Sequence, residues 1–168
     1  IMLFGKPQNQ KQLQKQVLFI LQEAEFQFFT GSVLHELQYG HAVTPELEAK
    51  TEALLKSMDM WDCRDRHPFS LSGGQMQRLA VVVSDICGKE LLVFDEPTSG
   101  LDLKSMEEVG ILTRSLATQG KVLLIITHDI EFMMRICTRI LFIRDGEIVE
   151  DLSGGQKEKI VRLLRGEE

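Results

Sequence analysis

Short apolar runs alternate with segments of helical periodicity along most of the chain. Three continuous apolar runs, each bounded by polar residues, have the composition of buried strands in a parallel sheet. They are residues 17–21, 91–94 and 122–126. Four further segments carry apolar residues at helical spacing, at residues 33–39, 44–58, 72–83 and 102–120. Thr44, followed by Pro45, and Asp102 are expected to cap the second and the fourth of these helices. Strands and helices that alternate in this way predict an α/β fold with a mostly parallel sheet.

The two ends of the chain are predicted to differ from this core. Residues 1–4 form an apolar segment that enters a turn, as expected of a strand already under way, and residues 8–16 predict a solvated turn or short helix. Near the other end, strand-like segments flank Asp145 and Gly146, a pair that favours the tight turn of a β-hairpin. Because the chain starts at Ile1 and not at Met, we expect that preceding residues were removed or left out.

Composition and charge restrict the classes of function. The 168 residues are 43% hydrophobic and 26% charged, which is ordinary for one globular domain. With 19 Lys and Arg against 25 Asp and Glu, the formal net charge is −6, so we expect no nucleic-acid partner. The three cysteines form no CxxC pair, which favours reduced thiols in the cytosol. The apolar runs are far shorter than a membrane span, so any link to a membrane is expected to come through a partner.

The strand at residues 91–94 is followed directly by two acids. Asp95 and Glu96 are therefore expected at the carboxyl end of a parallel strand, the end at which α/β sheets bind ligands. There Asp95 could hold Mg²⁺ through water, and Glu96 could polarise an attacking water molecule. Taken alone, such a pair is more often a solvated strand terminus.

A second candidate site precedes that strand. The segment Ser72-Gly73-Gly74-Gln75 opens a helix, and the unpaired N–H groups in the first turn of a helix attract anions. The same residues satisfy a capping box, in which Ser72 and Gln75 cap the helix without any ligand. On these residues alone, both interpretations remain open.

The combination of segments is more specific than any one of them. In order along the chain come Leu71-Ser72-Gly73-Gly74-Gln75, then Gln77-Arg78, the strand that ends in Asp95-Glu96, and Ser99-Gly100-Leu101-Asp102. The chain therefore resembles the nucleotide-binding domain of ABC ATPases, in which the signature motif, the Walker B segment and the D-loop follow this order. The resemblance implies an α/β P-loop NTPase core that uses ATP and Mg²⁺. It also implies an inserted α-helical signature subdomain at residues 28–84, between core segments at 1–27 and 85–168.

The resemblance implies a role for each matching residue. Ser72, Gly73, Gly74 and Gln75 would contact the terminal phosphate of ATP bound by a partner subunit, and Asp102 would couple the two ATP sites. Asp95 would help to hold Mg²⁺, and Glu96 would act as the base. Gln22 matches the Q-loop, which reaches the metal and the attacking water, and His128 matches the H-loop, which contacts the terminal phosphate.

One expected motif does not occur in these 168 residues. A phosphate loop (Walker A) requires GxxxxGK followed by Ser or Thr, whereas the Gly-Lys pairs here are followed by Pro7, Glu90 and Val122. The resemblance therefore covers an N-terminally truncated domain.

Without a phosphate loop, one helix N-terminus and a few side chains remain to bind the phosphates of ATP. A helix N-terminus contributes only about 0.3–1 kcal/mol of binding free energy per charge, whereas micromolar affinity requires ~8 kcal/mol. We expect the isolated chain to lack ATPase activity and to bind ATP no more tightly than millimolar.

Residues 22–33 resemble a narrower group, the cobalt and energy-coupling-factor importer ATPases, although Ala24 and Phe26 depart from its pattern. The family implies a second ATPase subunit, identical or different, and a transmembrane permease, at the cytoplasmic face of the cell membrane. Phe26, Phe28 and Phe29 are then either core residues, the commoner case, or an exposed patch that receives a permease helix. We expect a transport ATPase, and an importer. Two alternatives remain: a non-catalytic module that completes a partner's ATP site, and a soluble ABC protein without a transport role.

The motif occurs a second time near the end of the chain. Leu152-Ser153-Gly154-Gly155-Gln156 repeats the five letters, but no apolar strand with paired acids follows it. We expect this copy to cap the last helix, whose residues Ile160, Val161, Leu163 and Leu164 face inward, and to bind no nucleotide.

Overall fold

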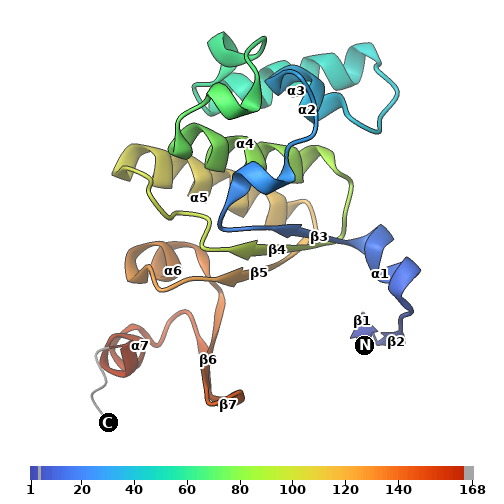
Figure 1. The fold of residues 1–168 in the computed structure, drawn as a ribbon. Helices are drawn as coiled ribbons and strands as arrows, with labels where there is room; N and C mark the ends of the chain where they lie inside the picture. The colour runs from blue at the N-terminus through green and yellow to red at the C-terminus, as the bar shows by residue number, and fades with distance from the viewer. Residues whose placement is uncertain (4, 165–168) are drawn as a thin grey trace. The chain divides into compact units, whose positions relative to one another are not determined.

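The computed structural model describes residues 1–3 and 5–164, and the chain forms two compact units, Ile1–Thr127 and His128–Glu168 (Figure 1). Phe4, in the predicted first strand, lies outside the described residues. The segment around it contains a small antiparallel hairpin of β1 (Met2–Leu3) and β2 (Lys6–Pro7). Helix α1 (Gln10–Gln16) follows, which confirms the predicted short helix.

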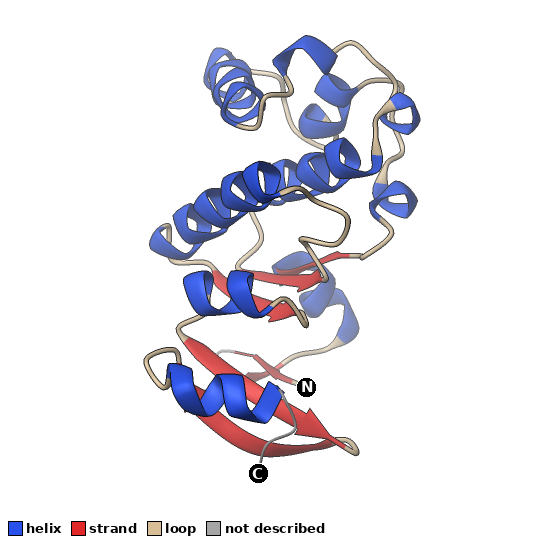
Figure 2. Ribbon diagram, turned by 90° about the vertical axis from the view of Figure 1, so that its left-hand side faces the viewer, coloured by secondary structure: helices blue, strands red, loops and turns tan. Residues whose placement is uncertain are grey.

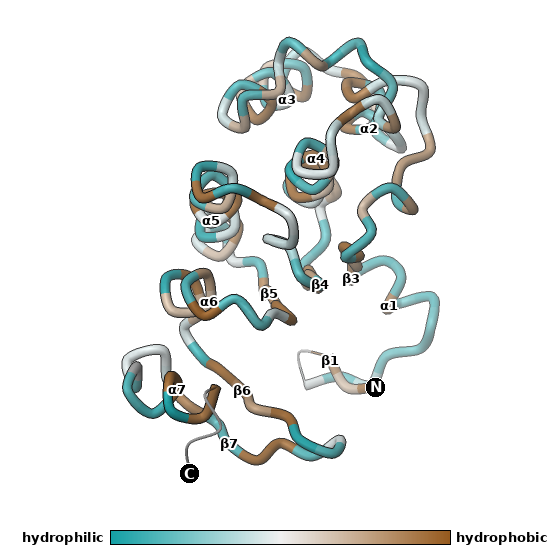
Figure 3. The backbone as a smooth tube through the Cα atoms, turned by 60° about the vertical axis from the view of Figure 1, so that its left-hand side comes forward, coloured by the Kyte–Doolittle hydropathy of each residue, from teal (hydrophilic) through white to brown (hydrophobic). Residues whose placement is uncertain are grey.

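A three-stranded parallel sheet forms the centre of the first unit. Its strands are β3 (Val17–Ile20), β4 (Leu91–Asp95) and β5 (Val122–Ile126), with β4 in the middle. Ile20 pairs with Phe94 and Asp95 pairs with Ile126, so the three carboxyl ends lie at one edge of the sheet. The predicted parallel α/β core is confirmed, and β3 and β5 are apolar, brown segments in Figure 3.

Burial differs between the middle strand and its neighbours. Leu92, Val93 and Phe94 of β4 are buried, as predicted. Phe19 of β3 and Leu124 of β5 lie in the register row of Val93, yet they are 54% and 50% exposed. The prediction that β3 and β5 are buried strands is therefore wrong for one face of the sheet. Within the described part of the chain both are outer strands, so their side chains have a neighbouring strand on one side only.

Two long helices lie on the same side of this sheet (Figures 1 and 2). They are α4 (Gly73–Ile86), which packs against β3, and α5 (Leu103–Thr118), which packs against β5 and against α4. Their predicted apolar faces are buried at Leu79, Val109 and Leu116. Leu103, another apolar residue of α5, is 67% exposed because it is the first residue of that helix, before the packed turns.

Smaller helices extend the first unit beyond α4. Helix α2 (Val33–Gln38) packs against both α3 (Pro45–Ser57) and α4. The start of α3 is as predicted, because Thr44 Oγ1 accepts a hydrogen bond from the N–H of Leu47 at 3.3 Å and Pro45 is the first helical residue. Three single 3₁₀ turns complete this region: η1 (Ala24–Gln27), η2 (Trp61–Cys63) and η3 (Pro68–Ser70).

The second unit is built on a β-hairpin. Strands β6 (Arg139–Arg144) and β7 (Glu147–Ser153) pair antiparallel. Asp145 and Gly146 between them both have positive φ, 51° and 83°, as the predicted Asp-Gly turn requires. Helices α6 (Ile130–Ile136) and α7 (Lys157–Leu164) pack on each other, and the core of the unit consists of Met133, Ile140, Leu152 and Ile160.

Candidate functional site

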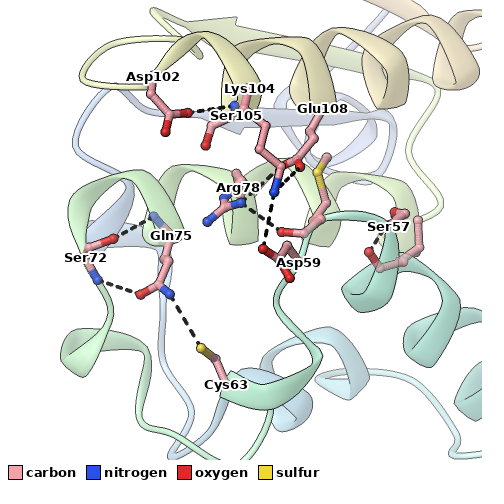
Figure 4. Close-up of polar contacts among 12 residues, drawn as sticks. Ser57, Asp59, Cys63, Ser72, Gln75, Arg78, Asp102, Lys104, Ser105 and Glu108 are labelled. Atoms are coloured by element: carbon pink, nitrogen blue, oxygen red, sulfur yellow. Dashed lines mark hydrogen bonds and ion pairs between the residues drawn. The ribbon is translucent and has the colours of Figure 1, made fainter.

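The N-terminus of α4 is capped by its own side chains. Ser72 Oγ accepts a hydrogen bond from the N–H of Gln75 at 3.3 Å, and Gln75 Oε1 accepts one from the N–H of Ser72 at 3.0 Å (Figure 4). These reciprocal bonds form the predicted capping box. The other end of the Gln75 amide, Nε2, donates to the sulfur of Cys63 in η2 at 3.6 Å. Both ends of this amide are thus oriented by the chain itself.

The two glycines in this capped turn are not required by its conformation. Gly73 and Gly74 are helical, and neither has a left-handed φ. Among the described residues, a β-carbon built on Gly73 would meet no atom within 4 Å. One built on Gly74 would be 3.4 Å from Cδ2 of Leu101, an ordinary contact. Glycine inside a helix costs roughly 0.5–1 kcal/mol relative to alanine, so these glycines weaken the helix while leaving its first N–H groups accessible.

The D-loop lies directly against this turn and starts the next helix. Leu101 lies nearest to the space that a side chain on Gly74 would fill, and the following residue, Asp102, is the predicted N-cap of α5. Its Oδ1 accepts a hydrogen bond from the N–H of Ser105 at 2.8 Å. The hydrogen bonds from Ser105, together with the nearby positive charges of Arg78 and Lys104, lower the pKa of Asp102. The exposed Asp102 is therefore a carboxylate at neutral pH.

The central strand ends in the two predicted acids. Asp95 is the last residue of β4, Glu96 follows it, and both are partly buried. Glu96 has a φ of 48°, in the left-handed region that residues other than glycine rarely adopt. Its N–H donates to the carbonyl oxygen of Ile126 at 2.9 Å, and its Oε2 accepts a hydrogen bond from Oγ1 of Thr127 at 3.3 Å. Such backbone conformations cost about 1–3 kcal/mol and are concentrated at functional sites.

One residue to which we assigned no role from the sequence links the two segments. Gln77 of α4 is 3% exposed, and its Nε2 donates to the carbonyl oxygen of Glu96 at 3.4 Å. The signature helix therefore contacts the strained residue at the end of β4. In the sequence, a polar amide beside the apolar residues Leu79 and Ala80, on the buried side of the helix, is the signal that would have identified Gln77 as a buried polar residue in need of a partner.

Gln22 and His128 follow the ends of the two outer strands. Each is exposed and lies two residues after its strand, Gln22 after β3 and His128 after β5. His128 begins the second unit, in which Asp129 caps α6 by accepting a hydrogen bond from the N–H of Phe132 at 2.9 Å. Both residues thus follow the carboxyl ends of the strands, as predicted, and their roles toward a nucleotide remain predictions.

The second LSGGQ segment has a different structure from the first. Ser153 is the last residue of β7 and α7 begins at Lys157, so the prediction that this segment caps the last helix from Ser153 is wrong. The reason is that strand pairing continues to the end of the hairpin, where Ser153 lies opposite Arg139. The next residue, Gly154, donates its N–H to the carbonyl oxygen of Thr138 at 2.9 Å.

A shallow hollow of about 310 Å³ lies beside the signature helix. Its lining residues are Glu25, Phe26, Phe69 and Met76. Phe26 and Phe69 are 65% and 60% exposed, whereas Phe28 is buried. Each of the two predicted alternatives for the phenylalanines therefore holds in part: Phe28 is a core residue, and Phe26 belongs to an exposed apolar surface.

Comparison with known proteins identifies the family. The family model described as "ABC transporter" matches residues 1–99 of this chain, from the first strand through the acids of β4 into the D-loop. The chain belongs to the ABC transporter family. In the language of that family, α4 is the signature helix, β4 the Walker B strand, and residues 99–102 the D-loop.

Relatives in the ABC family match most of this chain, but the chain spans only part of each relative. An ABC transporter ATP-binding protein of Treponema denticola is 44% identical over 160 residues, which are 95% of this chain and 32% of that protein. The cobalt import ATP-binding protein CbiO of Rhodobacter capsulatus is 32% identical over 141 residues, 82% of this chain and 50% of that protein. The structure of CbiO1 from Clostridium perfringens, part of the ABC transporter complex cbiONQ, matches with a TM-score of 0.78 over 98% of this chain and 70% of that chain, at 23% identity. The predicted ABC ATPase fold is confirmed.

The acids of the Walker B strand fit Mg²⁺ better than a metal ion held by a protein cage. Among residues 1–3 and 5–164, no group of three or more His, Cys, Asp or Glu side chains could hold a metal ion. Mg²⁺ is usually bound by one or two carboxylates together with phosphates, and it keeps several waters. A single partly buried carboxylate such as Asp95 meets that requirement.

The helices of the described residues are all too short or too polar to span a lipid bilayer.

Proposed function

We propose that this chain is the signature-bearing part of an ATP-hydrolysing ABC transporter subunit, with residues 28–84 as its signature subdomain. One observation carries the proposal: Gly73 and Gly74 weaken α4, although neither the backbone conformation nor the packing of its first turn requires glycine. A helix start built in this way leaves room for the phosphate groups of a nucleotide to reach the first N–H groups. Leu101 lies beside Gly74 and would complete the surface that approaches the nucleotide.

The residues of this surface would act on ATP held by a second ABC subunit, identical or different. Ser72 Oγ and the N–H groups of Gly73 and Gly74 would donate hydrogen bonds to the terminal phosphate, and Gln75 would contact it while its own N–H stays bonded to Ser72 Oγ. Their cap bonds keep the Ser72 and Gln75 side chains in place before ATP arrives, so little ordering is needed on binding. Asp102, at the start of the adjacent helix, would couple the two sites of the dimer.

The carboxyl ends of the strands would serve ATP bound by the same subunit. Glu96 would accept a proton from the attacking water, and the hydrogen bond from Thr127 restricts its carboxylate to one orientation. Gln22 and His128 would position the water and the terminal phosphate. Asp95, assisted by Gln22, would hold Mg²⁺, which neutralises phosphate charge when bound.

The hollow lined by Phe26, Phe69 and Met76 supports a permease as the second partner. Exposed apolar side chains around a shallow groove are suited to the apolar face of a helix. This partner would place the subunit at the cytoplasmic face of the membrane. The similarity to CbiO, a cobalt import protein, supports import as the direction of transport.

A second candidate function follows from the sequence itself. Since GxxxxGK[ST] does not occur in the 168 residues, a polypeptide with these residues alone would complete a partner's ATP site without hydrolysing its own ATP. The signature surface has the same role in both cases.

The proposal is tested in a version of the protein that carries a phosphate loop ahead of residue 1. Ser72→Arg places bulk and charge where the partner's phosphate would bind, so steady-state ATP hydrolysis should be lost. Ser153→Arg is the matched control, because it makes the same change in the second LSGGQ segment and should leave hydrolysis unchanged. Equal activity of the two variants, with both folded, would refute the proposal.

A further inference from the structure

Arg78 joins the signature helix to two other helices. One guanidinium nitrogen of Arg78, on α4, donates to Oε2 of Glu108 on α5 and to the carbonyl oxygen of Met58 at the end of α3, each at 3.0 Å (Figure 4). The side chains of Arg78 and Glu108 are only 12% and 15% exposed. A charged pair between α4 and α5 is thus largely withdrawn from water.

The position of this pair along the two helices is matched. Arg78 is six residues after Ser72, the N-cap of α4, and Glu108 is six residues after Asp102, the N-cap of α5. Six residues of α-helix correspond to about 9 Å along the axis. The pair therefore joins the two helices at the same distance from their N-termini.

A second contact joins the same helices at their N-terminal ends. Leu101, immediately before Asp102, lies against Gly74 in the first turn of α4. The two helices thus approach each other at two levels, at their first turns and at the ion pair six residues after each N-cap, in addition to the packing between them. Neighbours at two levels constrain both the separation and the relative tilt of the first turns.

Energetics favour such a geometric role for the pair. A buried ion pair loses much of its attraction to desolvation, and apolar residues of similar volume often give equal or greater stability. Among the described residues, Nε of Arg78 has no hydrogen-bond partner, which adds to the desolvation cost. What the pair adds beyond apolar packing is direction, since a guanidinium and a carboxylate must meet in a defined arrangement.

We propose that Arg78 and Glu108 are positioning residues that hold the first turns of α4 and α5 in register, so that the signature segment and the D-loop move as one body. The inference rests on the proposed function, because it assigns the pair to the closure of the ATP site. Neither residue is among those assigned above to the nucleotide or to Mg²⁺.

The same network offers a matched control. Lys104 lies 3.5 Å from Oε1 of Glu108 and 3.4 Å from Oδ2 of Asp59, but its side chain is 71% exposed and that of Asp59 is 76% exposed. Exposed pairs of this kind contribute little. Lys104→Gln therefore removes a charge from the network while leaving the bonds from Arg78 to Glu108 and Met58 intact.

The first test compares ATP hydrolysis by Arg78→Gln, Glu108→Gln and Lys104→Gln in the version that carries a phosphate loop. For the first two variants we expect kcat to fall at least tenfold while KM for ATP changes less than twofold, because the phosphate loop, not this pair, retains the nucleotide. Lys104→Gln should change neither value more than twofold. Glu108→Gln leaves the bond from Arg78 to Met58 in place, so it decides the question if Arg78→Gln does not fold. A kcat within twofold of wild type in a folded Arg78 or Glu108 variant overturns the inference.

A second test does not depend on ATP hydrolysis. The N–H groups of Met76 and Met106 donate to the carbonyl oxygens of Ser72 and Asp102, both at 2.9 Å, so their hydrogen exchange reports on the two first turns. In Arg78→Gln or Glu108→Gln both amides should exchange at least tenfold faster, with the core of β4 unchanged. Exchange that is unaltered, or accelerated throughout the unit, overturns the inference. Absence of hydrolysis in the wild-type version would refute the proposed function instead, and the exchange result would still decide the role of the pair.

Discussion

Gly154 packs against Cys137 so closely that a β-carbon on Gly154 would clash with the Cys137 carbonyl oxygen. This relationship accounts for Gly154, the first of the two glycines in the second LSGGQ segment, through the fold of the second unit, whereas a β-carbon on Gly155 would meet no described residue closer than 4.0 Å. The glycines of the first segment have no equivalent constraint, because an added β-carbon meets nothing at Gly73 and only an ordinary contact at Gly74. The fold therefore requires one glycine of the second LSGGQ segment, whereas it requires neither glycine of the first.

The two segments should respond oppositely to alanine. Gly73→Ala should leave stability unchanged or raise it by up to ~1 kcal/mol, since it improves helix propensity without a clash. Gly154→Ala should lower stability by about 1–3 kcal/mol, the usual range for overpacking. Urea unfolding of the 168-residue chain, followed by circular dichroism, measures both changes. A Gly73→Ala protein that is the less stable of the two would contradict the structural distinction.

The two serines should also differ in stability. Ser72→Ala removes an N-cap bond from α4 and should cost about 1 kcal/mol. Ser153 is the last residue of β7 and is exposed, so Ser153→Ala should change stability by less than about 0.5 kcal/mol, as at other surface positions. The same unfolding measurement compares the two variants. An equal loss of stability in both would mean that Ser153 caps a helix as Ser72 does.

Glu96 should be needed for turnover but not for nucleotide binding. In the version with a phosphate loop, Glu96→Gln keeps the shape of the side chain and removes its basicity, and loss of a general base typically lowers rates ~10²–10⁴-fold. ATP affinity, measured by calorimetry, should remain within a few fold of wild type. Glu90→Gln is the control at the other end of the same strand, since Glu90 immediately precedes β4. Near-normal hydrolysis by Glu96→Gln would place the base elsewhere.

The sequence pattern predicted those features that depend on neighbouring residues. The caps at Ser72, Thr44 and Asp102 follow from side chains that bond backbone groups three residues away, and all three are present. The parallel sheet and the family also followed from motifs and apolar runs. Local chemistry was therefore a reliable guide to where α3, α4 and α5 start.

Features that depend on distant residues were not predictable in this way. A continuous apolar run does not reveal whether its strand is central or outer, so the exposure of Phe19 and Leu124 could not be foreseen. The position of Ser153 was misjudged because pairing with Arg139 extends β7 beyond the point where a helix cap was expected. The bond from Gln77 to Glu96 joins residues 19 positions apart and is visible only in the fold.

The central claim is that the Ser72–Gln75 surface acts on a nucleotide bound by another subunit. Its most direct test mixes two proteins that are each expected to be inactive. The first is the 168-residue chain, with an intact signature but no GxxxxGK[ST] segment. The second carries a phosphate loop together with Ser72→Arg, so that its ATP lacks a working signature opposite it.

We predict that mixing restores ATP hydrolysis, in proportion to the added chain until the second protein is saturated. Glu96→Gln in the 168-residue chain should not prevent this restoration, because the base belongs to the subunit that holds ATP. Ser72→Arg in the chain should abolish it. Hydrolysis that fails to appear on mixing, or that appears equally with the Ser72→Arg chain, would contradict the account.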